Sequence, residues 1–135
     1  MQNIVQGKET ESKEQQGDPV RLDVEKALER LGGLKRLYIK ILQNVLTDPS
    51  VQKEELERLL AAGDMKAAER LVHTVKGFGG SIGADGLYKI GEQLELLCRD
   101  NMVASQPDVL ARFQTELENT LEAVRQYLAR EGQAG

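Results

Sequence analysis

Apolar residues recur at helical spacing along most of this sequence, and that spacing limits the folds open to it. Successive residues of an α-helix lie about 100° apart, so apolar residues three and four positions apart share one face. Successive segments follow this spacing, and none alternates as a half-buried strand would. Their apolar residues are Val24, Ala27, Leu28 and Leu31; Leu34, Leu37, Tyr38, Ile41, Leu42, Val45 and Leu46; Val51, Leu56, Leu59 and Leu60; Ala68, Leu71, Val75, Phe78 and Ile82; Leu87, Ile90, Leu94, Leu97 and Cys98; and Leu110, Phe113, Leu117, Leu121, Val124 and Leu128. The sequence therefore predicts an all-α protein.

Residues that cap or end helices separate these segments. Asp23 and Asp64 can each accept a hydrogen bond at the start of a helix, and glycines at 32–33 and at Gly83 can end one. The pair Asp48-Pro49 stops the second segment, and proline suits the first turn of the next helix. Because the connections are short, neighbouring helices should pack antiparallel. We expect an antiparallel up-down four-helix bundle with a short additional N-terminal helix. The second and third segments are either two helices or one helix bent at the proline.

The start of the chain differs from the rest in composition. Residues 1–18 are polar and glutamine-rich, and 8–16 are almost entirely polar. Such a segment buries too little apolar area to offset the entropy lost on ordering. We expect a disordered arm or linker at 1–18 and one helical domain at 19–131.

Composition and charge exclude several classes of protein. With 135 residues, 40% hydrophobic and 30% charged, the chain has the balance of one globular domain. Its formal net charge of −4 argues against nucleic-acid binding, which would need a basic face. No apolar run approaches the roughly 20 residues of a membrane span, and no signal peptide is evident. The only cysteine, Cys98, can form no disulfide within the chain, which fits a cytoplasmic location, and we expect it in the core.

The only histidine, His73, lies in a helical segment that also contains several glycines. On a helical wheel Lys76, Gly77 and Gly80 fall on its side, opposite the apolar stripe. Glycine inside a helix costs about 0.5–1 kcal/mol relative to alanine, so glycines on an exposed face need a reason. The close approach of a bulky partner to the imidazole is one such reason. A neutral imidazole can attack phosphorus, and Lys76 is placed to support a transferring phosphoryl group.

The run His73-x-x-Lys76-Gly77 resembles the signature of histidine-containing phosphotransfer (HPt) domains. The similarity covers about residues 20–130. It includes Leu31-Gly32-Gly33, Leu37-Tyr38, Ala62-Gly63-Asp64, Ile82-Gly83-Ala84, Leu87 and Leu94-Glu95. Phe78 departs from the family pattern, which usually has a small residue two positions before Gly80. We interpret Phe78 as packing between helices.

The resemblance implies a phosphocarrier of two-component phosphorelays. The histidine of such a domain accepts a phosphoryl group from the aspartate of one receiver domain and passes it to another receiver. By resemblance His73 is the phosphoacceptor and Lys76 supports the phosphoryl charge. Gly77 and Gly80 leave room for the partner, and Glu95 lies where some family members orient the imidazole.

The resemblance also sets expectations about partners and cofactors. The chain would be a cytoplasmic monomer without a kinase domain of its own, and so not an enzyme. Its partners would be response-regulator receivers or a hybrid sensor histidine kinase, with no nucleic acid and no membrane insertion. We expect no cofactor or metal of its own, because the partner receiver would supply Mg²⁺.

Alternative functions stay open on the sequence alone. The chain could be the phosphoacceptor domain of a chemotaxis-type histidine kinase, or a helical adaptor that is never phosphorylated. A metal site is disfavoured, because one histidine and one cysteine on separate helices are too few ligands. A Ser-His-Asp hydrolase is disfavoured, because Ser81 lies on a different face from His73. For Glu95 the alternative is an ordinary exposed glutamate.

Overall fold

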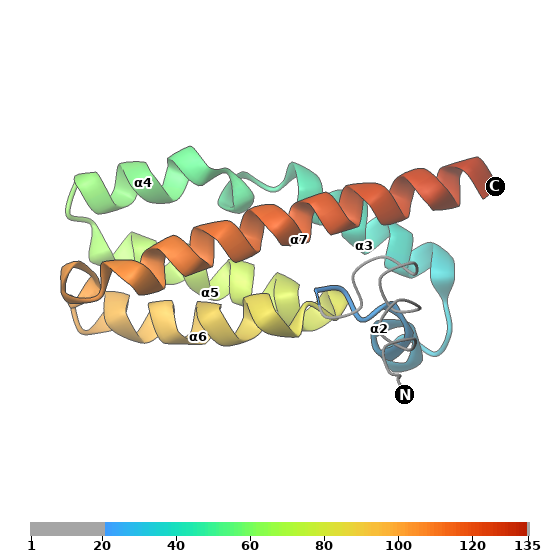
Figure 1. Ribbon diagram of the computed structural model, residues 1–135, viewed down its shortest axis with the longest axis horizontal. Helices are drawn as coiled ribbons and strands as arrows, with labels where there is room; N and C mark the ends of the chain where they lie inside the picture. The colour runs from blue at the N-terminus through green and yellow to red at the C-terminus, as the bar shows by residue number, and fades with distance from the viewer. Residues whose placement is uncertain (1–20, 135) are drawn as a thin grey trace, which may run out of the picture.

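The computed structural model describes residues 21–134, and this part of the chain is helical with no strand (Figure 1). Its elements are α2 (Val24–Arg30), α3 (Lys35–Thr47), the 3-10 helix η1 (Pro49–Val51), α4 (Lys53–Ala61), α5 (Met65–Ile82), α6 (Asp85–Arg99), the 3-10 helix η2 (Val103–Ser105) and α7 (Pro107–Ala134). The expected all-α fold is confirmed. The arm expected at 1–18 lies outside the described residues.

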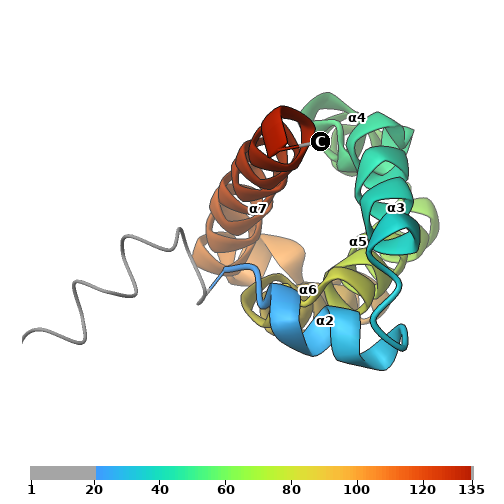
Figure 2. The same cartoon turned by 90° about the vertical axis from the view of Figure 1, so that its right-hand side faces the viewer.

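The structure is a bundle of four helical segments, with the short helix α2 across one end. The first segment consists of α3 followed by α4, and α5, α6 and α7 are the other three (Figures 1 and 2). Asp48 accepts a hydrogen bond from the Ser50 amide at 2.8 Å, so η1 separates α3 from α4 and the two are distinct helices. Helix α7, with 28 residues, is long enough to run beside both. No helix among residues 21–134 is long and apolar enough to cross a membrane.

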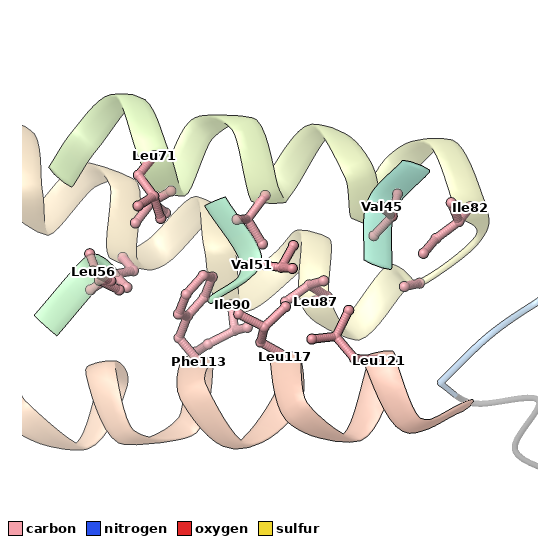
Figure 3. Packing of buried hydrophobic residues seen from close by; sticks show 14 of the residues in the cluster. Val45, Val51, Leu56, Leu71, Ile82, Leu87, Ile90, Phe113, Leu117 and Leu121 are labelled. Carbon is pink, nitrogen blue, oxygen red and sulfur yellow. The ribbon is translucent and has the colours of Figure 1, made fainter. Parts of the chain in front are cut away.

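The core lies along the axis of the bundle and is almost entirely aliphatic. Phe113, Leu117 and Leu121 of α7 point towards side chains of the facing helices and of η1 (Figure 3). Cys98 is also buried, as expected, and burial raises the pKa of its thiol to about 11. Three further buried residues of α7, Val109, Thr120 and Tyr127, were not on the predicted stripe.

Two leucines of the second predicted stripe are exposed rather than buried. Leu37 is 43% exposed because it lies about 100° around α3 from Tyr38, outside the buried line that Leu42 continues. Leu34 is 59% exposed and precedes the first helical residue, where φ −80° and ψ 87° take it out of the helical register. The predicted stripe was therefore too wide at this end of α3.

The C-terminal end of α5 is held by residues that come much earlier in the chain. Gly83 ends α5 in the left-handed region at φ 88°, and its carbonyl accepts a hydrogen bond from the Asp23 amide at 2.8 Å. The Ile82 carbonyl accepts one from the Tyr38 hydroxyl at 2.8 Å, and the Gly80 carbonyl accepts one from Arg30 at 2.8 Å. The last carbonyls of a helix have no partner within it, so α2 and α3 satisfy groups that α5 itself cannot.

We expect Tyr38→Phe to destabilise the fold by about 1–3 kcal/mol, because it leaves the Ile82 carbonyl without its buried donor while keeping the ring. Urea unfolding followed by circular dichroism would measure the loss. Tyr88→Phe is the matched control: Tyr88 is 39% exposed, and its replacement should change the free energy of unfolding by less than about 0.5 kcal/mol. Equal stability of Tyr38→Phe and wild type would contradict the assignment.

Candidate functional site

His73 lies near the middle of α5, on the side that faces away from the core. Asp64 begins the helix by accepting a hydrogen bond from the Ala67 amide at 3.1 Å. From there the buried line through Ala68 and Val75 fixes the direction of each later residue. The His73 side chain is 66% exposed as a result. It opens onto a surface hollow whose lining is Lys66, Glu69, Arg70, His73, Thr74 and Glu95.

The carboxylate of Glu95, on α6, contacts both His73 and Lys76. Its Oε2 lies 2.9 Å from His73 Nδ1, and its Oε1 lies 2.8 Å from Lys76 Nζ. Glu95 is only 7% exposed, so it is not an ordinary surface glutamate. An ionised carboxylate can only accept hydrogen bonds, so Nδ1 carries the proton in the neutral ring. The lone pair of the imidazole is then on Nε2.

The charges of Glu95 and Lys76 stabilise each other. Burial alone raises the pKa of Glu95, but hydrogen bonds from Lys76 and His73 outweigh burial and leave that pKa below its ordinary value. The hydrogen bond to Glu95 raises the pKa of Lys76. The carboxylate and the ammonium are therefore both charged at neutral pH.

Contacts between α5 and α6 follow one antiparallel register across the site. Each step of three or four residues along α5 is matched by a similar step back along α6. The pairs are Glu69 with Arg99, whose Oε2 and Nε lie 3.2 Å apart; His73 with Glu95; Lys76 with Gly91; and Gly80 with Tyr88. Residues of both helices therefore form the site.

The side chain of Lys76 is less exposed than its position on the helical wheel predicted. Its side chain is 16% exposed, and its ammonium lies 5.5 Å from the centre of the Tyr88 ring as well as beside Glu95. A cation over an aromatic face is attracted to the ring. Lys76 is thus held close to His73 in a defined place.

The two glycines expected to give access to a partner differ in their surroundings. A Cβ added to Gly77 would meet nothing within 4 Å, and this residue is exposed. A Cβ added to Gly80 would lie 3.4 Å from the Tyr88 ring. Gly77 therefore borders open space, whereas Gly80 accommodates a side chain of the chain itself.

Sequence reasoning missed Gly91 and Tyr88. Arg99 approaches Glu95 as well as Glu69, with its NH2 group 3.9 Å from Glu95 Oε2. The missed signal is the helical spacing of Tyr88, Gly91, Glu95 and Arg99, which puts them on one face of α6.

Among residues 21–134 no three His, Cys, Asp or Glu side chains form a group that could hold a metal ion.

We expect the stability given by Glu95 to depend on pH. Because its pKa in the folded protein is below the ordinary 4.5, its contribution is complete above that value and is lost as the pH falls through the lowered pKa. Glu95→Gln should therefore be less stable than wild type by about 1–3 kcal/mol at neutral pH, with the gap closing in acid. Urea unfolding across the acid range would measure this gap.

Glu118→Gln, at an exposed position of α7, serves as the control and should show no such gap. A gap for Glu95→Gln that stays constant into strong acid would contradict the ionised pair with Lys76.

Comparison with known proteins agrees with the geometry. The model of the Hpt domain family matches residues 40–127, which is more than half of the chain. No curated protein and no solved structure matched. The matched residues include all of α5 and α6, and so His73, Lys76 and Glu95. The chain therefore belongs to the Hpt domain family, the histidine-containing phosphocarriers of two-component signalling.

Proposed function

We propose that His73 accepts a phosphoryl group from the phosphoaspartate of one receiver domain and passes it to the aspartate of another. The observation that carries this proposal is the exposed imidazole whose Nδ1 is held by Glu95 at 2.9 Å. This contact leaves Nε2 as the nucleophile and restrains the orientation of the ring. An oriented nucleophile lowers the entropy cost of reaching an in-line geometry.

The proposed transfer exchanges one bond to phosphorus for another. The Nε2 lone pair of His73 forms the N–P bond while the P–O bond to the aspartyl carboxyl group breaks, and the aspartate leaves as a carboxylate. The phosphorylated ring keeps its proton on Nδ1 and gains a positive charge, which the Glu95 carboxylate stabilises. In the second transfer the next aspartate attacks phosphorus, and the N–P bond breaks to return neutral His73.

In the proposal Lys76 is the cation of this chain that supports the phosphoryl charge. Its ammonium shares the Glu95 carboxylate with His73, one helical turn away. Positive charge near the equatorial oxygens favours phosphoryl transfer. The Mg²⁺ that such transfers use would be supplied by the receiver together with its acidic pocket.

The charges around His73 fit an acidic partner. Lys66 and Arg70 lie on the same hollow, two turns and one turn before His73 on α5. The two carboxylates of the hollow already have partners, since Glu69 pairs with Arg99, and Glu95 with Lys76 and His73. Cationic groups beside the nucleophile would attract a receiver pocket built from carboxylates and increase the rate of encounter. The exposed side of Gly77 would let the partner close over the ring.

We expect His73→Gln to abolish phosphorylation of the chain. Incubation with ³²P-labelled phosphorylated receivers should label wild type, and the label should be acid-labile and alkali-stable, as a phosphoramidate is. Thr115→Ala, at an exposed position of α7 outside the hollow, is the control and should be labelled normally. Label on His73→Gln would disprove the assignment.

The same assay with isolated histidine-kinase cores and ATP identifies the phosphoryl donor. Rapid labelling by receivers and slow labelling by kinase cores supports the proposed relay. The reverse order would assign the chain to a chemotaxis-type kinase instead.

We expect Gly77→Val to slow transfer from a receiver at least about tenfold, because the added side chain would stand where the partner closes. The variant should fold normally, because the position is open and glycine is already a poor helix former. Direct phosphorylation by the small donor phosphoramidate should be unchanged, since this molecule needs little room. Equal slowing with both donors would instead indicate that Gly77 supports the imidazole itself.

A further inference from the structure

Gly91 lies at a close contact between α5 and α6 beside the site. It is buried, and it precedes Glu95 by one turn on the same face of α6. A Cβ added at Gly91 would lie 3.2 Å from the Cβ of Lys76, 3.5 Å from its Cα and 3.6 Å from its Cγ. Neither the Cβ nor the Cα of Lys76 can move away by side-chain rotation, because the backbone fixes both. The helices would have to move apart by a few tenths of an ångström.

The hydrogen bonds of the site span the same gap between the two helices. His73 and Lys76 reach from α5 to the Glu95 carboxylate on α6 at 2.9 and 2.8 Å. These distances are close to the optimum for such bonds, so a wider gap weakens both. The His73 contact is the more sensitive of the two, because a lysine side chain has more rotatable bonds than a histidine side chain.

We propose that Gly91 is a positioning residue of the site: the space left by its missing side chain sets the distance between α5 and α6 at which Glu95 can hold both His73 and Lys76. The effect on phosphotransfer rests on the proposed function of His73, but the effect on the imidazole does not. Gly91 therefore acts through Glu95 and does not touch the phosphoryl group.

The chain supplies a matched control at another close contact of the same two helices. A Cβ added to buried Gly79 would meet the Ala84 carbonyl oxygen and the Tyr88 amide nitrogen, each at 3.1 Å. That contact is at least as tight as the one at Gly91. It lies at the turn between α5 and α6, away from Glu95. Gly79→Ala should therefore loosen the helix pair without altering the hydrogen bonds of His73.

The first experiment measures the imidazole alone. Because the full 135-residue chain contains one histidine, ring ¹⁵N shifts report on His73 without assignment. At about pH 9, well above the ordinary imidazole pKa of about 6.5, wild type and Gly79→Ala should show Nδ1 protonated and Nε2 unprotonated. Gly91→Ala should show a mixture of the two tautomers. A wild-type pattern in Gly91→Ala, or an equal change in Gly79→Ala, would overturn the proposal.

A swap of side chains tests the spacing directly, and it applies even if Gly91→Ala alone folds poorly. Gly91→Ala combined with Lys76→Gly moves the empty space to the other helix, whereas Gly91→Ala combined with Lys76→Ala keeps the clash. Both pairs lose the lysine ammonium. The tautomer of wild type should return with Lys76→Gly and not with Lys76→Ala. The same spectrum for both pairs would refute a spacing role.

A rate measurement connects the spacing to phosphotransfer. Phosphorylation by phosphoramidate should slow about threefold to tenfold in Gly91→Ala and less than about twofold in Gly79→Ala, as a small misplacement of the nucleophile predicts. An unchanged rate in Gly91→Ala would remove the consequence for function. If wild type itself takes no phosphoryl group, the proposed function fails, and the ¹⁵N spectra still decide the role of Gly91.

Discussion

The nearly buried carboxylate of Glu95 is the interaction on which the site depends. A charge removed from water costs several kcal/mol unless other charges and hydrogen bonds replace the lost hydration. Lys76 and His73 provide that replacement from α5, and Arg99 approaches from the same helix as Glu95. Removal of any one partner would leave a buried carboxylate less well solvated. The network therefore favours one relative position of α5 and α6, and it orients the histidine at the same time.

The packing of α5 and α6 is what allows a carboxylate on one helix to reach two residues on the other. Glycines let the backbones of the pair approach, at Gly79 near the turn and at Gly91 beside Lys76. A helix interior normally disfavours glycine. Here the cost in helix propensity is offset by hydrogen bonds that only closely spaced helices can form. The glycines that lower the helix propensity of α5 and α6 are therefore the same residues that let the two helices approach each other closely.

The sequence predicted features that depend on a few neighbouring residues. Asp64 and Gly83 begin and end α5 as expected, because a cap needs only nearby groups. The outward direction of His73 follows from the helical period alone. The low exposure of the Lys76 side chain could not be predicted in the same way, because it depends on the register of α5 against α6. The helical period of neither helix determines that register. For the same reason Glu95 was expected only by resemblance, and Tyr88 was not expected at all.

The end of α5 shows that the matched family region is not structurally independent of what precedes it. Asp23, Arg30 and Tyr38 all come before residue 40, where the family match begins, and each donates a hydrogen bond to a carbonyl at or just after the last turn of α5. Helix ends open most readily, because their terminal groups lack partners within the helix. Opening of this end requires α2 and the start of α3 to detach as well, so it becomes a larger and rarer cooperative event. The short N-terminal helix thereby limits the slow fluctuations of the helix that carries the histidine, although it lies outside the site.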